Sequence, residues 1–221
     1  SVFKYSAWLR AAVAENRPYD VMARQLLTAG GSTIRNPAGN FYRTTADTND
    51  AMETSAQLFL GTRIQCAKCH NHPFERWTQS NYYGLAAVFH RVGRKKTVNK
   101  EEAVIFASTS GEVTHPATGQ TAAPWVPASG LLDVQDGQDR RVAFADWLTS
   151  PRNPWFARVE VNRIWAQVMG VGIVEPFDDF RDSNPPSNPA LLDALAADFR
   201  ASGYDRNHIL RTILNSRTYQ S

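Results

Sequence analysis

Residues 57–77 read QLFLGTRIQCAKCHNHPFERW, and in them an apolar helical pattern runs directly into a C-x-x-C-H motif. Apolar side chains recur at helical spacing over residues 52–60, with Asp50 as a candidate N-cap and Gly61 as the expected end of the helix. Pro73 disfavours helix at the residue before it. The sequence therefore predicts a helix followed by a short turn that holds the motif.

The motif uses every cysteine of the 221-residue chain, Cys66 and Cys69, and His70 follows the second one directly. C-x-x-C-H is the attachment pattern of a c-type haem. A separation of three residues places both thiols on one side of a helical turn, and the imidazole of the same turn can take the iron from one face. These residues predict a covalently bound haem c, with Cys66 and Cys69 as anchors and His70 as the proximal ligand.

Other chemistry fits the same residues. Zinc is one alternative, with Cys66, Cys69 and His70 as three ligands and the fourth from His72, His90 or a distant residue. A dithiol–disulfide redox pair is another, although no βαβ pattern precedes the motif. The plainest alternative is a pair of buried thiols beside a surface histidine.

A haem iron has a second axial position, for which the sequence offers two main candidates. Met52 lies on the preceding predicted helix, and His90 ends the following one, predicted over residues 79–89. His72 is a poorer candidate because it is tied to the same turn as His70, whereas a distal ligand approaches from the opposite face. His72 is instead the main reason to consider a metal site at this turn, with His72 as one of the ligands.

The sequence as a whole predicts a mainly α protein with helical bundle-like segments and a small β-containing insertion in its middle. The division we expect is a helical region over residues 1–95, a β-rich insertion or linker over residues 96–136, and a second helical region over residues 137–221. Within the insertion, short strands are expected at residues 104–106 and 111–113, and His115 is expected to be an exposed loop residue.

The charge and composition of the chain indicate which classes of function are not predicted. The net charge is +3, and the densest basic cluster, Arg91, Arg94, Lys95 and Lys96, is interpreted as a solvated loop. No basic face interleaved with aromatic residues is visible, so nucleic-acid binding is not predicted. No apolar run approaches the ~18 residues of a membrane span. The common hydrolase and nucleotide-binding motifs are absent from the sequence.

The stretch from METSAQLFLGTRIQCAKCH to GLAAVF resembles the core of the planctomycete-type cytochrome-c-like domain family. The stretch from RRVAFADWL to NSRTYQ is similar to the uncharacterised domain that usually follows it in tandem. The resemblance implies a predicted haem site at Cys66, Cys69 and His70, and a large exported protein of the bacterial cell envelope. It also implies that the present chain is a fragment, so the lack of a signal peptide carries no information on location.

The sequence hypothesis is therefore a c-type haem-binding module of a larger periplasmic or otherwise exported protein, acting in electron transfer. Its expected partners are a redox protein or neighbouring domains of the same polypeptide. The alternative is a zinc- or other metal-stabilised interaction module built on the same cysteines, with His70 and His72 as metal ligands. A third hypothesis is an enzyme that uses an open haem position.

Overall fold

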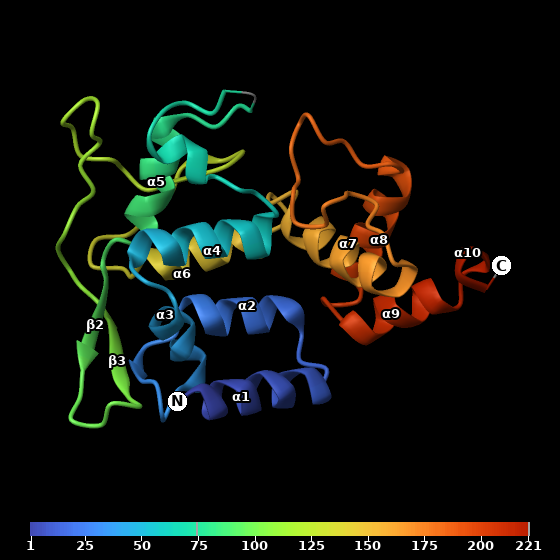
Figure 1. The fold of residues 1–221 in the computed structure, drawn as a ribbon, viewed down its shortest axis with the longest axis horizontal. Helices are drawn as coiled ribbons and strands as arrows, with labels where there is room; N and C mark the ends of the chain where they lie inside the picture. Colours follow the sequence, from blue (N-terminus) through green and yellow to red (C-terminus); the bar gives the residue numbers. More distant parts are fainter. Residues whose placement is uncertain (74, 221) are drawn as a thin grey trace.

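The computed structural model describes residues 1–73 and 75–220, and it confirms a mainly α protein with a small β-containing part. The α-helices of this described part are α1 (Val2–Ala14), α2 (Tyr19–Leu27), α3 (Asn40–Thr44), α4 (Thr48–Leu60), α5 (Gln79–Phe89), α6 (Arg140–Leu148), α7 (Phe156–Met169), α8 (Pro189–Ala201), α9 (Arg206–Leu214) and α10 (Arg217–Gln220). Two short 3-10 helices, η1 (Pro37–Gly39) and η2 (Gln65–Lys68), complete the helical part. Helices α1 to α6 lie on one side of the molecule and α7 to α10 on the other (Figure 1).

Helix α4, which leads into the motif, begins one turn earlier than Asp50 suggested. Asp47 is its N-cap, and the side chain of Asp47 accepts a hydrogen bond from the backbone amide of Asp50. Asp50 turns back and accepts from the amide of Ala46 at 2.6 Å. Gly61 ends the helix in the left-handed conformation, at φ 59°, as predicted.

The β structure consists of β1 (Gly31–Ser32), β2 (Val92–Lys96), β3 (Ala103–Ala107), β4 (Trp125–Val126) and β5 (Gly130–Leu131). Strands β1, β3 and β2 form an antiparallel sheet in that order, and β4 pairs with β5. The strand predicted at residues 104–106 is confirmed, whereas residues 111–113 form none. The basic cluster is not a loop, because Arg94, Lys95 and Lys96 lie in β2.

The proposed boundary between residues 95 and 96 falls inside β2, and the division into three regions stays a prediction. The buried apolar side chains form one connected core that draws on both helical regions. At its centre Tyr19 of α2 stacks on Phe156 of α7 with ring centroids 4.9 Å apart, and Phe59 of α4 lies 6.1 Å from Phe156. The two helical regions therefore share a hydrophobic core.

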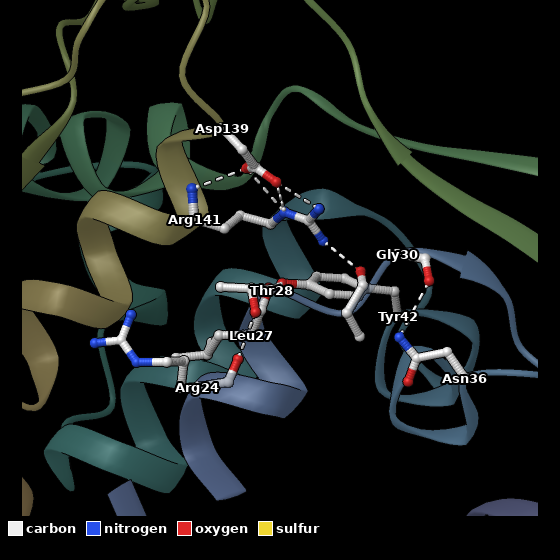
Figure 2. A network of polar contacts seen from close by, with 9 residues as sticks. Arg24, Leu27, Thr28, Gly30, Asn36, Tyr42, Asp139 and Arg141 are labelled. Atoms are coloured by element: carbon white, nitrogen blue, oxygen red, sulfur yellow. Dashed lines mark hydrogen bonds and ion pairs between the residues drawn. The ribbon is translucent and has the colours of Figure 1, made fainter. Parts of the chain in front are cut away.

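A buried polar junction also joins the two regions (Figure 2). Arg141 of α6 is only 2% exposed, and its guanidinium donates to the carbonyl of Ala29, just after α2, at 2.9 Å. The same guanidinium pairs with Asp139 at 2.7 Å and lies over the ring of Tyr42, 5.1 Å from its centroid. We call Arg141, Asp139, Tyr42 and Ala29 the Arg141 junction.

Candidate haem-attachment site

The motif begins on the 3-10 turn η2, which four residues separate from the end of α4, with Cys66 inside η2, Cys69 as its C-cap and His70 directly after it. A 3-10 helix has three residues per turn, so side chains three positions apart lie above one another. Cys66 and Cys69 are accordingly both exposed, and neither is in a disulfide. Ala67, between them, is 0% exposed and belongs to the core. The turn is therefore anchored through Ala67 while both thiols remain accessible.

Helix α5 holds the backbone of this turn in place. Gln79 donates from Nε2 to the carbonyls of Lys68 and Cys69, each at 3.1 Å. Tyr83, one helical turn further on, donates its hydroxyl to the carbonyl of Lys68 at 3.2 Å. These bonds use main-chain oxygens of the turn and leave the two sulfur atoms for other chemistry.

His70, the histidine of the motif, and His72, two residues further on, make different hydrogen bonds. His70 is exposed, and its Nδ1 lies 2.7 Å from the carbonyl oxygen of Asn71. A carbonyl can only accept, so Nδ1 of a neutral His70 carries the proton and Nε2 carries the lone pair that a metal requires. His72 is half-buried, and its Nδ1 accepts from the backbone amide of Glu75 at 3.1 Å. The lone pair of that nitrogen is already in use.

Neither distal-ligand candidate lies at the motif turn. Met52 is 0% exposed and packs in the core near the start of α4, whereas the motif follows the end of that helix. His90 is the exposed C-cap of α5, while η2 is bonded to the first turns of that helix. At 1.5 Å per residue, His90 lies roughly 16 Å along the axis from Gln79.

A different histidine lies close to the motif. His115 is 9% exposed rather than an exposed loop residue, which corrects the prediction from sequence. Its Nε2 lies 3.2 Å from the hydroxyl of Ser80 on α5, and its ring centroid is 5.4 Å from that of Tyr83. The burial of His115 arises because the isolated bridge between Thr114 and Thr121 folds the loop back on itself. Such a contact within an irregular loop leaves no periodic pattern in the sequence.

The loop after the motif reaches the second helical region. Glu75 accepts from the hydroxyl of Ser183 at 2.5 Å and from the amide of Asp182 at 3.3 Å. The guanidinium of Arg76 lies 5.3 Å from the ring centroid of Trp77 and 5.5 Å from that of Trp155. The position of this loop therefore depends on residues about a hundred positions away in the chain.

A second contact holds the end of α4 against the same distant segment. Asp178 pairs with Arg63 at 2.7 Å and accepts from Gln57 at 2.5 Å, and the amide of Phe180 donates to the carbonyl of Gly61 at 2.7 Å. Burial alone would raise the pKa of Asp178, but the hydrogen bonds from Gln57 and Arg63 outweigh it and hold the pKa below its usual range.

The motif is a surface feature in this structure. Five surface cavities of the described part of the chain, of about 290 to 550 Å³, are lined by residues other than Cys66, Cys69 and His70. Within residues 1–73 and 75–220, no three His, Cys, Asp or Glu side chains are grouped so that they could hold a metal ion. No helix in this described part is both long and apolar enough to cross a membrane.

Comparison with protein families gives two matches in tandem. Residues 1–94, which include the motif, match the family model PSCyt2, described as a protein of unknown function (DUF1549). Residues 140–221 match the family model PSD1, described as a protein of unknown function (DUF1553). None of the curated proteins or solved structures compared with the chain matches it. Over these two stretches the chain is thus similar to the planctomycete cytochrome-c-like domain pair, PSCyt2 followed by PSD1.

Proposed function

We propose that this chain is a c-type haem-binding module of a larger exported bacterial protein, and that it acts in electron transfer. One observation carries the proposal: both cysteines are unpaired and exposed on one 3-10 turn, directly before an exposed histidine. Each thiol would add across a vinyl group of the porphyrin, with sulfur bonding to one carbon and hydrogen to the other. His70 would ligate the iron through Nε2.

The residues present fit the attachment chemistry of a haem. The donor set consists of two accessible thiols and an imidazole with a free Nε2 lone pair, and it requires no change in the core. When bound, the haem would supply one-electron chemistry, and the chain would set its potential through axial ligation and burial. Because the motif lies at the surface, we expect a neighbouring domain or a redox partner to provide part of that burial.

The proposed location follows from the cofactor. Covalent attachment of haem c takes place outside the bacterial cytoplasm, so the module would be periplasmic or otherwise exported. The zinc alternative requires a rearrangement of the loop, since His72 uses Nδ1 to accept from Glu75. It remains a prediction with no favouring contact among the described residues.

The test is a visible absorption spectrum, oxidised and reduced, of the chain exported from a host that matures c-type cytochromes, with iron and zinc determined by elemental analysis. We expect a c-type reduced spectrum that survives denaturation and is lost in the Cys66→Ala/Cys69→Ala variant. His72→Ala is the matched control, because it removes a histidine of the same loop that the proposal does not use.

Three results would overturn the proposal. A folded, colourless protein without iron is the first. Stoichiometric zinc that is lost in both the double cysteine variant and His72→Ala is the second, and it would establish the metal-stabilised module instead. Haem that dissociates on denaturation is the third, because it would show that the thiols form no covalent bond.

A further inference from the structure

A second candidate site lies far from the motif, between α3 and the β2–β3 hairpin. A cavity of about 550 Å³ opens there, within the size range of sites for small molecules. The hairpin occupies the end of the molecule opposite to α8–α10 (Figure 1). The cavity is lined by Arg43, Arg94, Lys95, Lys96, Thr97, Lys100, Glu102 and Ala103.

The positive charge of the whole chain is concentrated at this cavity. Its lining holds five cationic side chains and one carboxylate, which is five minus one, or +4. The entire chain carries only +3 at neutral pH, so all its other ionisable side chains together sum to −1. A cavity whose walls carry one sign of charge concentrates ions of the opposite sign.

The single carboxylate of the lining is already engaged. Glu102 accepts from the hydroxyl of Ser32 with Oε1 and from that of Thr97, at 3.3 Å, with Oε2. None of the ion pairs found in the described part of the chain involves one of the five cations. No ion pair among the described residues therefore neutralises these five cations, although the nearby carboxylates of Asp47 and Asp50 favour the charged form of Arg94.

Two arginines shape the cavity through bonds to the backbone. Arg94 donates to the carbonyls of Thr45, Ala46 and Asp47 and to the Thr45 hydroxyl, which fixes its guanidinium without a bond to a carboxylate. Arg43 donates to the carbonyl of Lys100 at 3.2 Å, which ties the hairpin turn to α3. The three lysines of the lining, Lys95, Lys96 and Lys100, are exposed to solvent.

We propose that this cavity binds a small oxyanionic ligand, a phosphate or sulfate ester. Guanidinium and ammonium groups are the side chains that recognise such groups. The lining contains no aromatic side chain on which a base could stack, which disfavours a nucleic acid. Arg43 and Arg94 lie within the stretch that matches the PSCyt2 model, whereas the other six lining residues, between positions 95 and 103, lie outside both family matches.

Isothermal titration calorimetry on the full chain at low and at physiological ionic strength tests the proposal. The probes are glucose 6-phosphate, glucose 6-sulfate, inorganic phosphate, inorganic sulfate and glucose. We expect binding of the charged probes and none of glucose. The Lys96→Gln/Lys100→Gln variant, which spares the bonds of both arginines, should weaken binding by at least about tenfold.

Arg211→Gln/Arg217→Gln is the matched control, since it removes the same charge from exposed positions of α9 and α10. Its affinity should equal that of the unaltered chain. Tighter binding of the esters than of the inorganic ions supports a ligand that fills the cavity, and equal binding supports recognition of the oxyanion alone.

Three outcomes would overturn the proposal. If the control variant loses as much affinity for the charged probes as the lysine variant does, then only the overall charge of the chain matters. A complete loss of binding at physiological ionic strength would mean that no site is built. If a single-stranded oligonucleotide binds and the small probes do not, the cavity recognises a nucleic acid rather than a small oxyanionic ligand.

Discussion

The Arg141 junction and the motif turn are two polar connections of this molecule, and they are built in opposite ways. At the junction, a buried guanidinium binds Asp139 and the Ala29 carbonyl with its side-chain nitrogens (Figure 2). At the motif turn, the side chains of Gln79 and Tyr83 on α5 donate to main-chain carbonyls, and the side chains of Cys66 and Cys69 remain exposed.

The junction therefore has side chains that are engaged inside the protein, whereas the motif turn has side chains that stay accessible. Side chains whose polar atoms are all bonded inside the protein cannot bind anything else without a loss of stability. A turn held through its backbone can change partners at its side chains while the fold persists. The comparison therefore implies that the junction determines stability and that the motif can be modified at little cost.

The largest effect is expected at the junction. Arg141→Met removes the guanidinium and leaves Asp139 and the Ala29 carbonyl without their partner, which should lower the free energy of unfolding by about 3 kcal/mol. Urea unfolding followed by circular dichroism measures it. Arg217→Met, at an exposed position, is the control and should stay within about 0.5 kcal/mol. Equal stabilities of the two variants would contradict the role given to the junction.

The next largest loss of stability is expected for Gly61→Ala, which tests how the end of α4 is held against the second helical region. In Gly61→Ala, the new Cβ would lie 2.6 Å from Phe180 Cδ2 and 3.0 Å from Val159 Cγ2, at a φ of +59°. Overlap and backbone strain together should cost about 2–3 kcal/mol in the same unfolding experiment.

Gly170→Ala is the matched control for Gly61→Ala. Gly170 also ends a helix, at φ +81°, but an added Cβ would meet nothing within 4 Å. Only the backbone cost of about 1 kcal/mol should remain. If the two variants lose the same stability, the contact with Phe180 does not hold this end of α4.

A smaller effect is expected from the ion pair beside that contact. The folded pKa of Asp178 lies below its ordinary value of 3.8, so the pair contributes stability above that value, and the contribution is lost as the pH falls through the folded pKa. Asp178→Asn should cost about 1 kcal/mol at pH 6, because Arg63 is half exposed and solvent screens the pair.

The difference between the Asp178→Asn variant and the unaltered chain should shrink as the pH is lowered below 4. Urea unfolding at several pH values between 6 and 3 measures this convergence. Asp136→Asn, in an exposed loop, is the charge-matched control. A difference that stays constant over the whole range would show that Asp178 acts through shape rather than charge.

The smallest effect on stability is expected at the two thiols of the motif turn. Cys66→Ala/Cys69→Ala removes two exposed thiols and should change the free energy of unfolding of the haem-free chain by less than about 0.5 kcal/mol. Ala67→Val, in the same turn but at 0% exposure, should cost about 1–3 kcal/mol by overpacking. A large loss in the double cysteine variant would mean that the thiols are structural.

Local patterns predicted much of the helical fold and the location of the candidate site. The pattern over residues 52–60 and Gly61 predicted α4 and its end, because periodicity and a left-handed C-cap are local properties. The spacing of Cys66 and Cys69 likewise placed both thiols on one side of a turn. Strand β2 escaped prediction, since its Arg94, Lys95 and Lys96 show no alternation of apolar and polar residues.

The packing of the two helical regions against each other could not be predicted from local sequence patterns. The contacts of Glu75 with Ser183 and of Arg141 with Ala29 each join residues more than a hundred positions apart. The same holds for His115, whose burial depends on α5 and on the fold of its own loop.

Residue spacing in the sequence alone identified the C-x-x-C-H motif as the candidate site and located most of the helices, because both are local patterns. Only the tertiary structure decided that the motif turn faces solvent, that His90 and Met52 lie away from it, and that five cations line one cavity. These features depend on which distant segments pack together. That choice is made by burial of the shared core and by hydrogen bonding of the groups buried with it.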